Sequence, residues 1–463
     1  MSSGLDTMPL CHIDLRLIAC CLPLLAVLPG AATASEACFY DIKIADATAS
    51  RLDMDVRCSD QSLLDILSPP DDAAAAFIER IAAPSGHATF SIDLSGFAAA
   101  SQSRDGALRV GGSLLVTPSA IIPAPLGDVD LTFAIAGGDA ALSLPRGSDG
   151  AYYLSAGRLR DAGEWVFGHF GRIAVDDMPA LAIVQLDAAL ALTPDGLGRW
   201  IGDVAASNAR FWGRVPVDPT LLVLMPDTGV RGLSGGRVMA AGGATILLRI
   251  GDQTALFDFY EEWVLVHEFL HLGSPLVRDT GIWFNEGIAT YFEPILRARA
   301  GWKTEDAVWL EWIDWMPRGV ADLGPPGLAQ ARRPYWGGAL FMLLADIELR
   351  RRSDGRRGVE DCLRDILRQG ANIAIRWPTA AVIAACDQDD GDAGVFAGLA
   401  ARYLYGGEVL DLDTLWRNLG VSKSDTGGIV YDDTAPLAHV RQAIVWGGAD
   451  QDWAPIGGYR ATP

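Results

Sequence analysis

Two histidines spaced four residues apart place the strongest constraint on how this chain of 463 residues can fold. His267 and His271 enclose Glu268 in the sequence His-Glu-Phe-Leu-His. On an α-helix, positions i and i+4 lie on one face, so both imidazoles can reach one metal ion while the carboxylate stays beside it. Residues 262–266 are apolar enough to extend a buried helix. The sequence therefore predicts a buried helix that carries two metal ligands.

Glu286, in the segment Trp-Phe-Asn-Glu-Gly at 283–287, is the candidate for a third ligand. A catalytic zinc ion takes three protein ligands and keeps a fourth position open, so the two histidines and Glu286 complete a set for one Zn²⁺ per chain. Asp279 and Glu293 remain alternative ligands because they lie nearby. We expect Asp279 in a turn between two helices. We expect Glu293 on the helix face of Glu286, where it either orients a ligand or is an ordinary helix carboxylate.

Glu268 is the predicted catalytic residue of this cluster. It follows His267 directly and therefore points away from the metal axis, which leaves it free to act as a base. Zinc lowers the pKa of a coordinated water towards neutrality, and a neighbouring carboxylate can take its proton and pass it to a leaving amine. His-Glu-x-x-His is the signature of zinc peptidases. The sequence thus predicts a zinc metallopeptidase with peptide or protein substrates.

Composition limits the classes of partner and the number of domains. A chain of 463 residues exceeds what one hydrophobic core usually holds, so more than one domain is expected. The net charge of −21 argues against a nucleic-acid partner, because a phosphate backbone would be repelled. A solvated acidic surface is the preferred interpretation.

The N-terminal segment 1–34 is predicted to be a signal peptide. Residues 15–28 are largely apolar, Arg16 marks their start, and Ala-Thr-Ala at 32–34 supplies small residues for cleavage. The mature chain would begin near Ser35, be periplasmic or secreted, and have no membrane association after cleavage. An uncleaved anchor is the alternative, although the apolar run is short for a membrane span.

Four cysteines remain after the predicted cleavage site and form two pairs that are local in sequence. Cys38 lies near Cys58, and Cys362 lies near Cys386. This arrangement suits an oxidising compartment and favours disulfides within each pair. Four cysteines allow three pairings, and buried free thiols remain an alternative.

Hydrophobic periodicity divides the mature chain into three parts. Residues 35–170 alternate apolar and polar positions in short runs, clearest at 90–94, 108–110 and 129–135, which predicts an N-terminal antiparallel β-sandwich with one helix at 71–83. Residues 171–420 are predicted to form an α/β plus α-helical catalytic domain. Residues 421–463 are left as a C-terminal extension.

Several elements of the predicted catalytic domain have clear sequence signals. Thr193 is placed to cap a helix that has Pro194 in its first turn. Apolar runs at 221–225 and 245–248 predict strands of a sheet behind the metal-binding helix. Helices are predicted at 283–300, 335–351, 359–369 and 393–405.

The chain resembles the gluzincin aminopeptidases, and most closely the glycyl aminopeptidase family, which is related to aminopeptidase N. The resemblance rests on His-Glu-Phe-Leu-His, on Trp-Phe-Asn-Glu-Gly-Ile-Ala-Thr-Tyr-Phe-Glu at 283–293, and on Tyr-Trp-Gly-Gly at 335–338. It extends from about Phe211 to about Gly420 and implies a thermolysin-like domain that hydrolyses peptide bonds with zinc. It also implies that Tyr335 matches the tyrosine whose hydroxyl stabilises the oxyanion. A rim or core aromatic is the alternative role for Tyr335.

The chain departs from that family at the substrate strand and at the C-terminus. Aminopeptidase N relatives carry a Gly-x-Met-Glu-Asn strand whose glutamate holds the free amine of the substrate. We expect the matching edge strand at Gly242, Gly243 and Ala244, where no carboxylate is present but a peptide backbone could still pair. This favours relaxed selectivity for free N-termini. Residues 421–463 are too few for the PDZ module that many glycyl aminopeptidases carry.

Two rival functions remain at this stage. Gly-Leu-Ser-Gly-Gly at 232–236 matches the nucleophile elbow of serine hydrolases, with Ser234 as nucleophile and His439 downstream, yet no helix pattern follows directly. A non-catalytic exported binding protein on a gluzincin fold is the other possibility. The presence of Glu268 argues against it.

Overall fold

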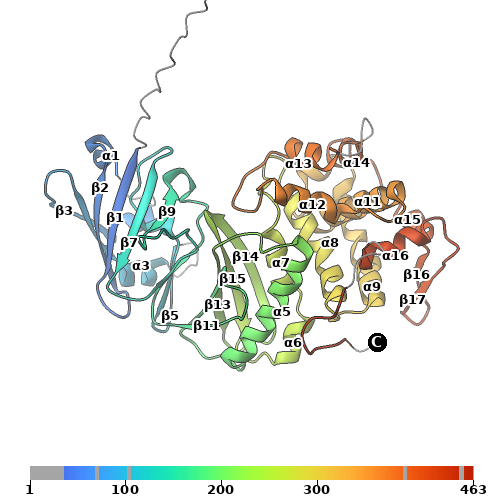
Figure 1. Ribbon diagram of the computed structural model, residues 1–463, viewed down its shortest axis with the longest axis horizontal. Helices are drawn as coiled ribbons and strands as arrows, with labels where there is room; N and C mark the ends of the chain where they lie inside the picture. The colour runs from blue at the N-terminus through green and yellow to red at the C-terminus, as the bar shows by residue number, and fades with distance from the viewer. Residues whose placement is uncertain (1–35, 68–71, 102–105, 389–393, 448–452, 462–463) are drawn as a thin grey trace, which may run out of the picture. The chain divides into compact units, whose positions relative to one another are not determined.

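The computed structural model describes residues 36–461, except for 68–71, 102–105, 389–393 and 448–452 (Figure 1). The predicted signal peptide at 1–34 lies outside the described residues. Within the described residues, no helix has both the length and the apolar character needed to cross a membrane.

The N-terminal part contains a six-stranded sheet in the order β3-β4-β2-β1-β7-β9. Along its central strand, Tyr40, Ile42 and Ile44 are buried while the intervening side chains face solvent, which gives the period of two expected for a sheet with one face in the core. The strands are β1 (Ala37–Ile44), β2 (Arg51–Cys58), β3 (Ile78–Ile81), β4 (Ala88–Asp93), β7 (Asp130–Ala136) and β9 (Tyr152–Ser155). The predicted all-antiparallel pairing is wrong at one place, because β1 and β7 run parallel.

A four-stranded sheet in the order β5-β6-β10-β8 shares its core with the first sheet. Phe133 of β7 meets Trp165 of β10 edge to face, with ring centroids 5.2 Å apart. The strands are β5 (Ala107–Val110), β6 (Ser113–Val116), β8 (Ala140–Ala141) and β10 (Trp165–Gly168). The helical elements here are α1 (Gln61–Asp65), α2 (Asp72–Ala75), α3 (Leu94–Ser101), α4 (Pro118–Ile121) and η1 (Ala156–Arg158).

The helix predicted at 71–83 is wrong over most of its length. Only α2 is helical, and Ile78–Ile81 forms β3, which pairs antiparallel with β4. Arg80 also donates a hydrogen bond from Nη2 to the Leu64 carbonyl at 3.2 Å. Pairing with a distant strand has overridden the local helical pattern, as tertiary context commonly does.

A five-stranded mixed sheet packs against α7 (Val264–His271), the helix that carries the two histidines of the predicted metal site. Its order is β11-β12-β13-β15-β14, in which β12, β13 and β15 are parallel while β11 and β14 are antiparallel edges. The strands are β11 (Phe170–Ile173), β12 (Leu181–Leu186), β13 (Thr220–Asp227), β14 (Leu233–Ala241) and β15 (Gly243–Gly251). Helix α5 (Pro194–Trp212) connects β12 to β13. Its first turn is capped by Thr193, whose Oγ1 accepts a hydrogen bond from Gly196 N at 3.2 Å.

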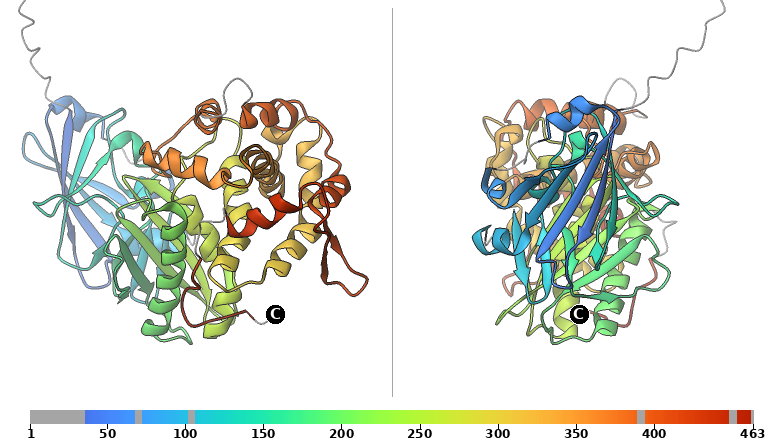
Figure 2. Two further views of the ribbon diagram at one scale, coloured as in Figure 1. Left: turned by 45° about the vertical axis from the view of Figure 1, so that its right-hand side comes forward. Right: turned by 90° about the vertical axis from the view of Figure 1, so that its left-hand side faces the viewer.

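The helices that follow residue 283, drawn yellow to red in Figure 2, form one helical body with α8 at its centre. A Cβ added to Gly338 would lie 2.8 Å from Gly287 Cα, so glycine on both helices lets α11 approach α8 closely. Two helices, α6 (Leu256–Glu261) and α7 (Val264–His271), precede this body. Its own helices are α8 (Trp283–Arg299), α9 (Glu305–Trp315), α10 (Pro317–Leu323), η2 (Leu328–Gln330), α11 (Tyr335–Ser353), α12 (Val359–Arg368), α13 (Thr379–Cys386), α14 (Val395–Leu399), η3 (Ala400–Leu404), α15 (Leu412–Leu419) and α16 (Ala438–Trp446).

The residues after Gly420 are packed into the same core as α8. They include the hairpin of β16 (Val421–Lys423) and β17 (Ile429–Tyr431), followed by α16. Arg299 Nε donates to the Val445 carbonyl at 2.7 Å, and Trp302 Nε1 donates to the Ile456 carbonyl at 3.1 Å. This segment therefore helps to hold the helical body together.

Both predicted disulfides are present. Cys38–Cys58 joins β1 to β2, and Cys362–Cys386 joins α12 to α13.

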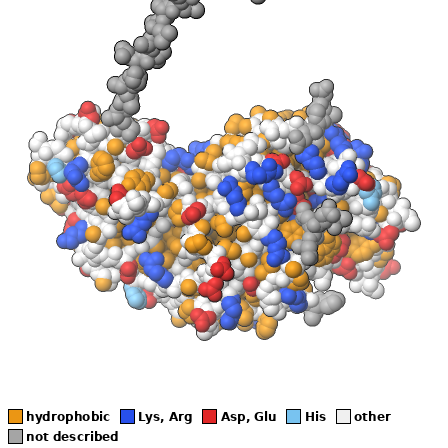
Figure 3. All heavy atoms as spheres, viewed as in Figure 1, with side chains coloured by type: hydrophobic (Ala, Val, Ile, Leu, Met, Phe, Trp, Pro, Cys, Tyr) orange, Lys and Arg blue, Asp and Glu red, His pale blue; other side chains and the backbone are white. Residues whose placement is uncertain are grey.

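On the face shown in Figure 3, acidic and basic side chains are interspersed with exposed apolar ones.

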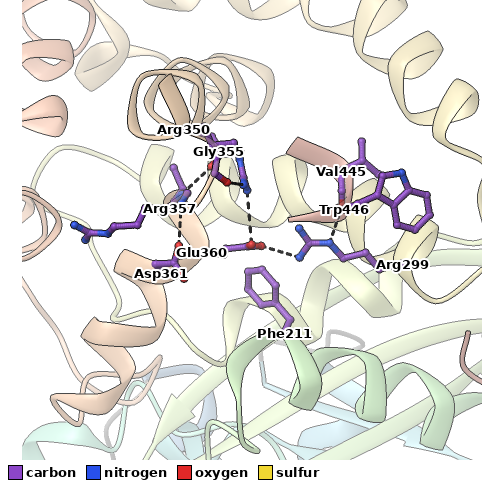
Figure 4. A network of polar contacts seen from close by, with 12 residues as sticks. Phe211, Arg299, Arg350, Gly355, Arg357, Glu360, Asp361, Val445 and Trp446 are labelled. Carbon is purple, nitrogen blue, oxygen red and sulfur yellow. Dashed lines mark hydrogen bonds and ion pairs between the residues drawn. The ribbon is translucent and has the colours of Figure 1, made fainter. Parts of the chain in front are cut away.

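Four buried charged residues form what we call the arginine cluster: Arg299, Asp346, Arg350 and Glu360. Figure 4 labels Arg299, Arg350 and Glu360. Arg299 Nη1 donates to Glu360 at 2.7 Å, and Arg350 Nε donates to Asp346 at 2.9 Å. Asp346 also accepts a hydrogen bond from the Tyr291 hydroxyl at 2.8 Å. Each charge has an opposite partner, so the cluster links α8, α11 and α12 without an unbalanced charge.

Candidate metal centre and active site

The three predicted ligands meet at one point between α7 and α8. His267 and His271 are only 5% and 9% exposed on α7, and Glu286 projects from the first turn of α8. Glu286 Oε2 lies 3.2 Å from His267 Nε2 and 3.7 Å from His271 Nε2. One ligand atom from each residue lies within 4.8 Å of the others. We call these three residues the metal triad.

The electrostatics of the metal triad favour cation binding. Burial lowers the pKa of His271 to about 4, so its imidazole is neutral at neutral pH and keeps a lone pair. Burial opposes protonation of His267, but its hydrogen bond to Glu286 and the neighbouring carboxylates raise its pKa. Burial also acts on Glu286, yet the two histidines hold its pKa below the ordinary value. Two imidazoles and one ionised carboxylate are a donor set that fits zinc.

Glu268 is buried beside the metal triad, with 7% of the residue exposed. Burial raises the pKa of its carboxyl to about 7, against a smaller opposing effect of His267. A pKa near neutrality is what a general base needs in order to accept and return a proton. The position and the environment of Glu268 therefore suit proton transfer.

The strand that borders Glu268 is β14, and the predicted edge strand was placed wrongly. Gly243 and Ala244 belong to β15, which is paired on both sides, and Gly242 is the turn residue that joins β14 to β15. The edge of the sheet next to the metal triad is formed by Leu233–Val238 of β14. The glycine-rich pattern at 241–245 marks a turn. It could not identify the edge strand, because strand order depends on pairing between residues that are distant in sequence.

Gly236 on β14 lies directly against the candidate base. A Cβ at this position would lie 2.6 Å from Glu268 Cγ and 2.7 Å from Glu268 Oε1. Glycine therefore lets the strand pass over the carboxylate. Sequence reasoning missed this residue, although a Gly-Gly pair within a strand is a signal of close approach by another group.

Tyr335 lies at the start of α11 and faces the metal triad. Burial raises the pKa of its hydroxyl, and the charges of Glu286 and Glu268 raise it further. The residue is 38% exposed and borders the cavities on both sides of His267. Its hydroxyl is a neutral hydrogen-bond donor at neutral pH.

The two alternative ligands are engaged elsewhere. Asp279 accepts hydrogen bonds from the Thr379 amide at 3.0 Å and from its hydroxyl at 2.7 Å, which ties the α7–α8 loop to α13. Glu293 accepts a hydrogen bond from Arg297 Nη1 at 3.1 Å and is 4% exposed. Its charge contributes to the raised pKa of His267. Neither carboxylate belongs to the metal triad.

Asn285, next to Glu286, organises the loop that joins the two ligand helices. Its Oδ1 accepts a hydrogen bond from Val277 N at 3.0 Å, and its Nδ2 donates to Ser274 Oγ at 3.0 Å and to the Pro275 carbonyl at 2.8 Å. These bonds fix the start of α8 relative to the end of α7. Asn285 therefore holds Glu286, the predicted third ligand, in place.

Two cavities open from the site. One of about 450 Å³ surrounds the metal triad and is bounded by β14 and the α7–α8 loop. The other, of about 630 Å³, extends from His267 between α8, α9, α10 and the start of α11. Trp263, His267 and Tyr335 border both cavities. A substrate that crosses the metal triad would therefore contact both.

The serine-hydrolase alternative has no support in the structure. Ser234 lies within β14, whereas a nucleophile elbow sits at a turn from a strand into a helix. Its hydroxyl donates a hydrogen bond to Asp227 at 2.7 Å. His439 lies on α16, outside both cavities.

Comparison with known proteins shows the fold. No protein-family model matches the chain, and no curated protein matches its sequence. A crystal structure of an aminopeptidase N family protein from Idiomarina loihiensis superimposes with a TM-score of 0.59 at 15% identity, over 84% of this chain and 81% of that one. Yeast LTA4 hydrolase in complex with bestatin gives a TM-score of 0.50 at 11% identity, over 81% of this chain and 68% of that one. The chain thus has a multidomain fold of mixed sheets and helices like that of the aminopeptidase N family protein.

Proposed function

We propose that this protein is an exported zinc-dependent peptidase. The observation that carries the proposal is the convergence of His267, His271 and Glu286, with Glu268 buried beside them on the helix of the two histidines. When bound, zinc supplies Lewis acidity that polarises a carbonyl group and acidifies water. The fold, which resembles that of an aminopeptidase N family protein, supports peptide hydrolysis as the reaction.

The residues of the chain divide the remaining work. Glu268 takes a proton from the attacking water on a carboxylate oxygen and delivers it to the amine nitrogen as the peptide C–N bond breaks. The Tyr335 hydroxyl donates a hydrogen bond to the carbonyl oxygen as it gains negative charge. The free edge of β14 pairs with an extended peptide backbone. The charge of Glu293 contributes to the raised pKa of His267.

We infer that selectivity for a free N-terminus is relaxed. An ammonium group taken out of water needs a partner carboxylate, and β14 contains none between Leu233 and Ala241. Asp279 and Glu293, the two candidates that the sequence offered, are bonded to Thr379 and Arg297. Peptides with blocked N-termini are therefore expected to be cleaved at rates comparable to free ones. A hundredfold preference for free amines would contradict this inference.

The finer assignments belong to the same proposal. The resemblance to the glycyl aminopeptidases suggests a thermolysin-like catalytic domain at 171–420, preceded by a β-rich domain at 35–170 and followed by a C-terminal extension at 421–463. The two disulfides are compatible with an oxidising compartment, which supports a periplasmic or secreted location.

The test compares Glu268→Gln with wild type and with Glu79→Gln, a change on the exposed β3 strand. Wild type and Glu79→Gln should bind close to one zinc per chain and cleave a panel of free and N-acetylated peptides. Glu268→Gln should keep the zinc and lose activity by roughly a thousandfold or more, since a general base contributes about 10²–10⁴-fold. Full activity of Glu268→Gln, or a zinc-loaded wild type that cleaves no peptide, would overturn the proposal.

A further inference from the structure

The larger cavity, which begins at His267, is walled by aromatic rings that the protein leaves exposed. Trp263, Trp315 and Tyr335 are 49%, 41% and 38% exposed, and all three line this cavity. Trp336 is half-buried and stacks on Trp315 with ring centroids 6.1 Å apart. Exposed aromatic surface gathered in one concave site favours binding of an apolar ring. Binding removes the apolar surface of both the ligand ring and the cavity rings from water.

Most charged groups in the cavity wall are already partnered. Glu293 is paired with Arg297, Glu311 is paired with Lys303, and the Arg318 guanidinium lies 3.7 Å from the ring centre of Trp315. These pairs leave little net attraction for a charged ligand. Three guanidinium groups (Arg297, Arg318 and Arg333) and three carboxylates (Glu293, Glu311 and Asp322) line the cavity, so these groups give its wall no excess charge of either sign.

Asp322 differs from the other charged groups of the wall. It lies on α10 and is half-buried, and its carboxylate has no hydrogen bond or ion pair with any residue that the structure describes. Burial raises the pKa of its carboxyl. A Cβ added to Gly337 would lie 2.7 Å from Asp322 Cβ, so α10 packs directly on the first turn of α11, beside Trp336. An acceptor without a partner at an aromatic wall suits a ring that carries a donor.

We propose that this cavity is the specificity pocket of the peptidase and takes a large aromatic side chain, tyrosine or tryptophan, from the substrate residue next to the scissile bond. Asp322 accepts the hydrogen bond of the phenol O–H or indole N–H. The cavity volume of about 630 Å³ accommodates such a side chain, whereas glycine or alanine would leave the tryptophan rings in water. The inference rests on the proposed function.

The first experiment measures kcat/KM for matched peptides that differ only at the residue on one side of the scissile bond, and then on the other. The series is Gly, Ala, Leu, Phe, Tyr and Trp. On one side, kcat/KM for Tyr and Trp should exceed that for Gly and Ala by at least about tenfold. This is the scale expected when a large apolar group fills a pocket that a small one leaves empty. Equal or faster cleavage of Gly and Ala on both sides would overturn the proposal.

Asp322→Asn tests the hydrogen bond, and Asp314→Asn is the matched control. Asp314 lies on the neighbouring helix α9, ion-pairs with Lys423 and does not line the cavity. Asp322→Asn keeps an acceptor oxygen but removes its charge, so it should reduce the preference for Tyr over Phe by about fivefold with Phe peptides unchanged, the difference between a hydrogen bond to a charged and to a neutral acceptor. Asp314→Asn should change neither the preference for Tyr over Phe nor the kcat/KM for Phe peptides. An equal loss for Phe and Tyr in Asp322→Asn would contradict the role of Asp322.

A binding measurement separates failure of this proposal from failure of the proposed function. The zinc-loaded Glu268→Gln protein is titrated by calorimetry with the same peptides, which requires no turnover. Tighter binding of Tyr and Trp peptides than of Ala peptides supports the pocket even where no peptide is cleaved. Cleavage of peptides without any aromatic preference in rate or binding supports the peptidase and refutes the pocket. Trp315→Ala should weaken aromatic peptides selectively in both assays.

Discussion

The metal triad and the arginine cluster are both groups of buried ionisable side chains, but they are satisfied in opposite ways. In the arginine cluster, two guanidinium groups donate to two carboxylates, with distances of 2.7 Å and 2.9 Å for the principal bonds. In the metal triad, three atoms that could ligate a metal ion lie within 4.8 Å of one another, and Glu268 adds a further carboxylate. Carboxylates meet guanidinium groups in the first case, whereas in the second the Glu286 carboxylate meets two imidazoles that can also bind a metal ion.

Two glutamates show what this difference does. Glu360 and Glu268 are both deeply buried, and burial alone raises the pKa of each carboxyl. Arg299 and Arg350 outweigh burial at Glu360 and hold its pKa below the ordinary value. No guanidinium offsets burial at Glu268, and its pKa rises to about 7. Burial therefore identifies neither a structural nor a catalytic carboxylate, and the neighbouring charges distinguish them.

Breaking the metal triad should have the largest effect. Glu286→Gln replaces an ionised ligand with a neutral amide and should lose most of the bound zinc. The value of kcat/KM should fall by more than about 100-fold, because loss of an outer partner of a metal ligand alone can cost up to that factor. Zinc content by elemental analysis and kcat/KM measure the two effects. Asp279→Asn is the control, since Asp279 bonds to Thr379 outside the triad. Full zinc retention in Glu286→Gln would move the third ligand elsewhere.

Breaking the arginine cluster should reduce stability without touching the metal. Glu360→Gln leaves two buried guanidinium groups without their shared carboxylate, which should cost about 3–5 kcal/mol in the free energy of unfolding. Zinc content and kcat/KM of the folded protein should stay at wild-type values. Glu408→Gln, which breaks an exposed pair with Arg402, should leave stability unchanged. Equal stability of both variants would show that the cluster contributes nothing.

The pH dependence of stability sharpens the same comparison. The folded pKa of Glu360 lies below its unfolded value, so its contribution is fully present above the unfolded pKa of about 4.5 and is lost as pH falls through the folded pKa. Wild type should therefore lose stability below about pH 4.5 more steeply than Glu360→Gln. Denaturant unfolding between neutral pH and the acid range measures the difference. If the free energy of unfolding falls equally with pH in the two proteins, Glu360 does not contribute to the loss of stability in acid.

Local patterns in the sequence were enough to place the helices around the metal triad. The helix predicted at 283–300 is observed at Trp283–Arg299, and the predicted cap at Thr193 is made. These features depend on residues within a few positions of one another. The two disulfides were predictable for the same reason, since each joins cysteines that are close in sequence.

Features that depend on distant residues were not predictable. The edge strand was placed at Gly242–Ala244, whereas β14 is the edge, because strand order is decided by pairing across the whole sheet. Residues 78–81 became a strand through β4 for the same reason. The aromatic cavity escaped notice because Trp263, Trp315 and Asp322 come from separate helices and have no common spacing. Sequence periodicity describes one element at a time, and a pocket is made by several.

The smallest expected effect tests whether Glu268 needs its position as well as its pKa. Gly236→Ala places a Cβ within 2.6 Å of Glu268 Cγ, so either the carboxylate or β14 must shift by several tenths of an ångström. Displacement of about 1 Å can cost about 100-fold in rate, so this smaller shift should lower kcat/KM by about tenfold. Zinc content should not change, because Gly236 does not contact the metal triad.

Gly398→Ala is the control for this change, since a Cβ there meets nothing within 4 Å. It should leave kcat/KM at the wild-type value. A Gly236→Ala variant with wild-type activity would show that the base tolerates displacement, and that its raised pKa matters more than its exact place. A variant that loses zinc as well as activity would show that β14 supports the metal triad itself. Retained zinc with reduced activity is the expected result, and it would assign to Gly236 the single task of leaving room for the carboxylate.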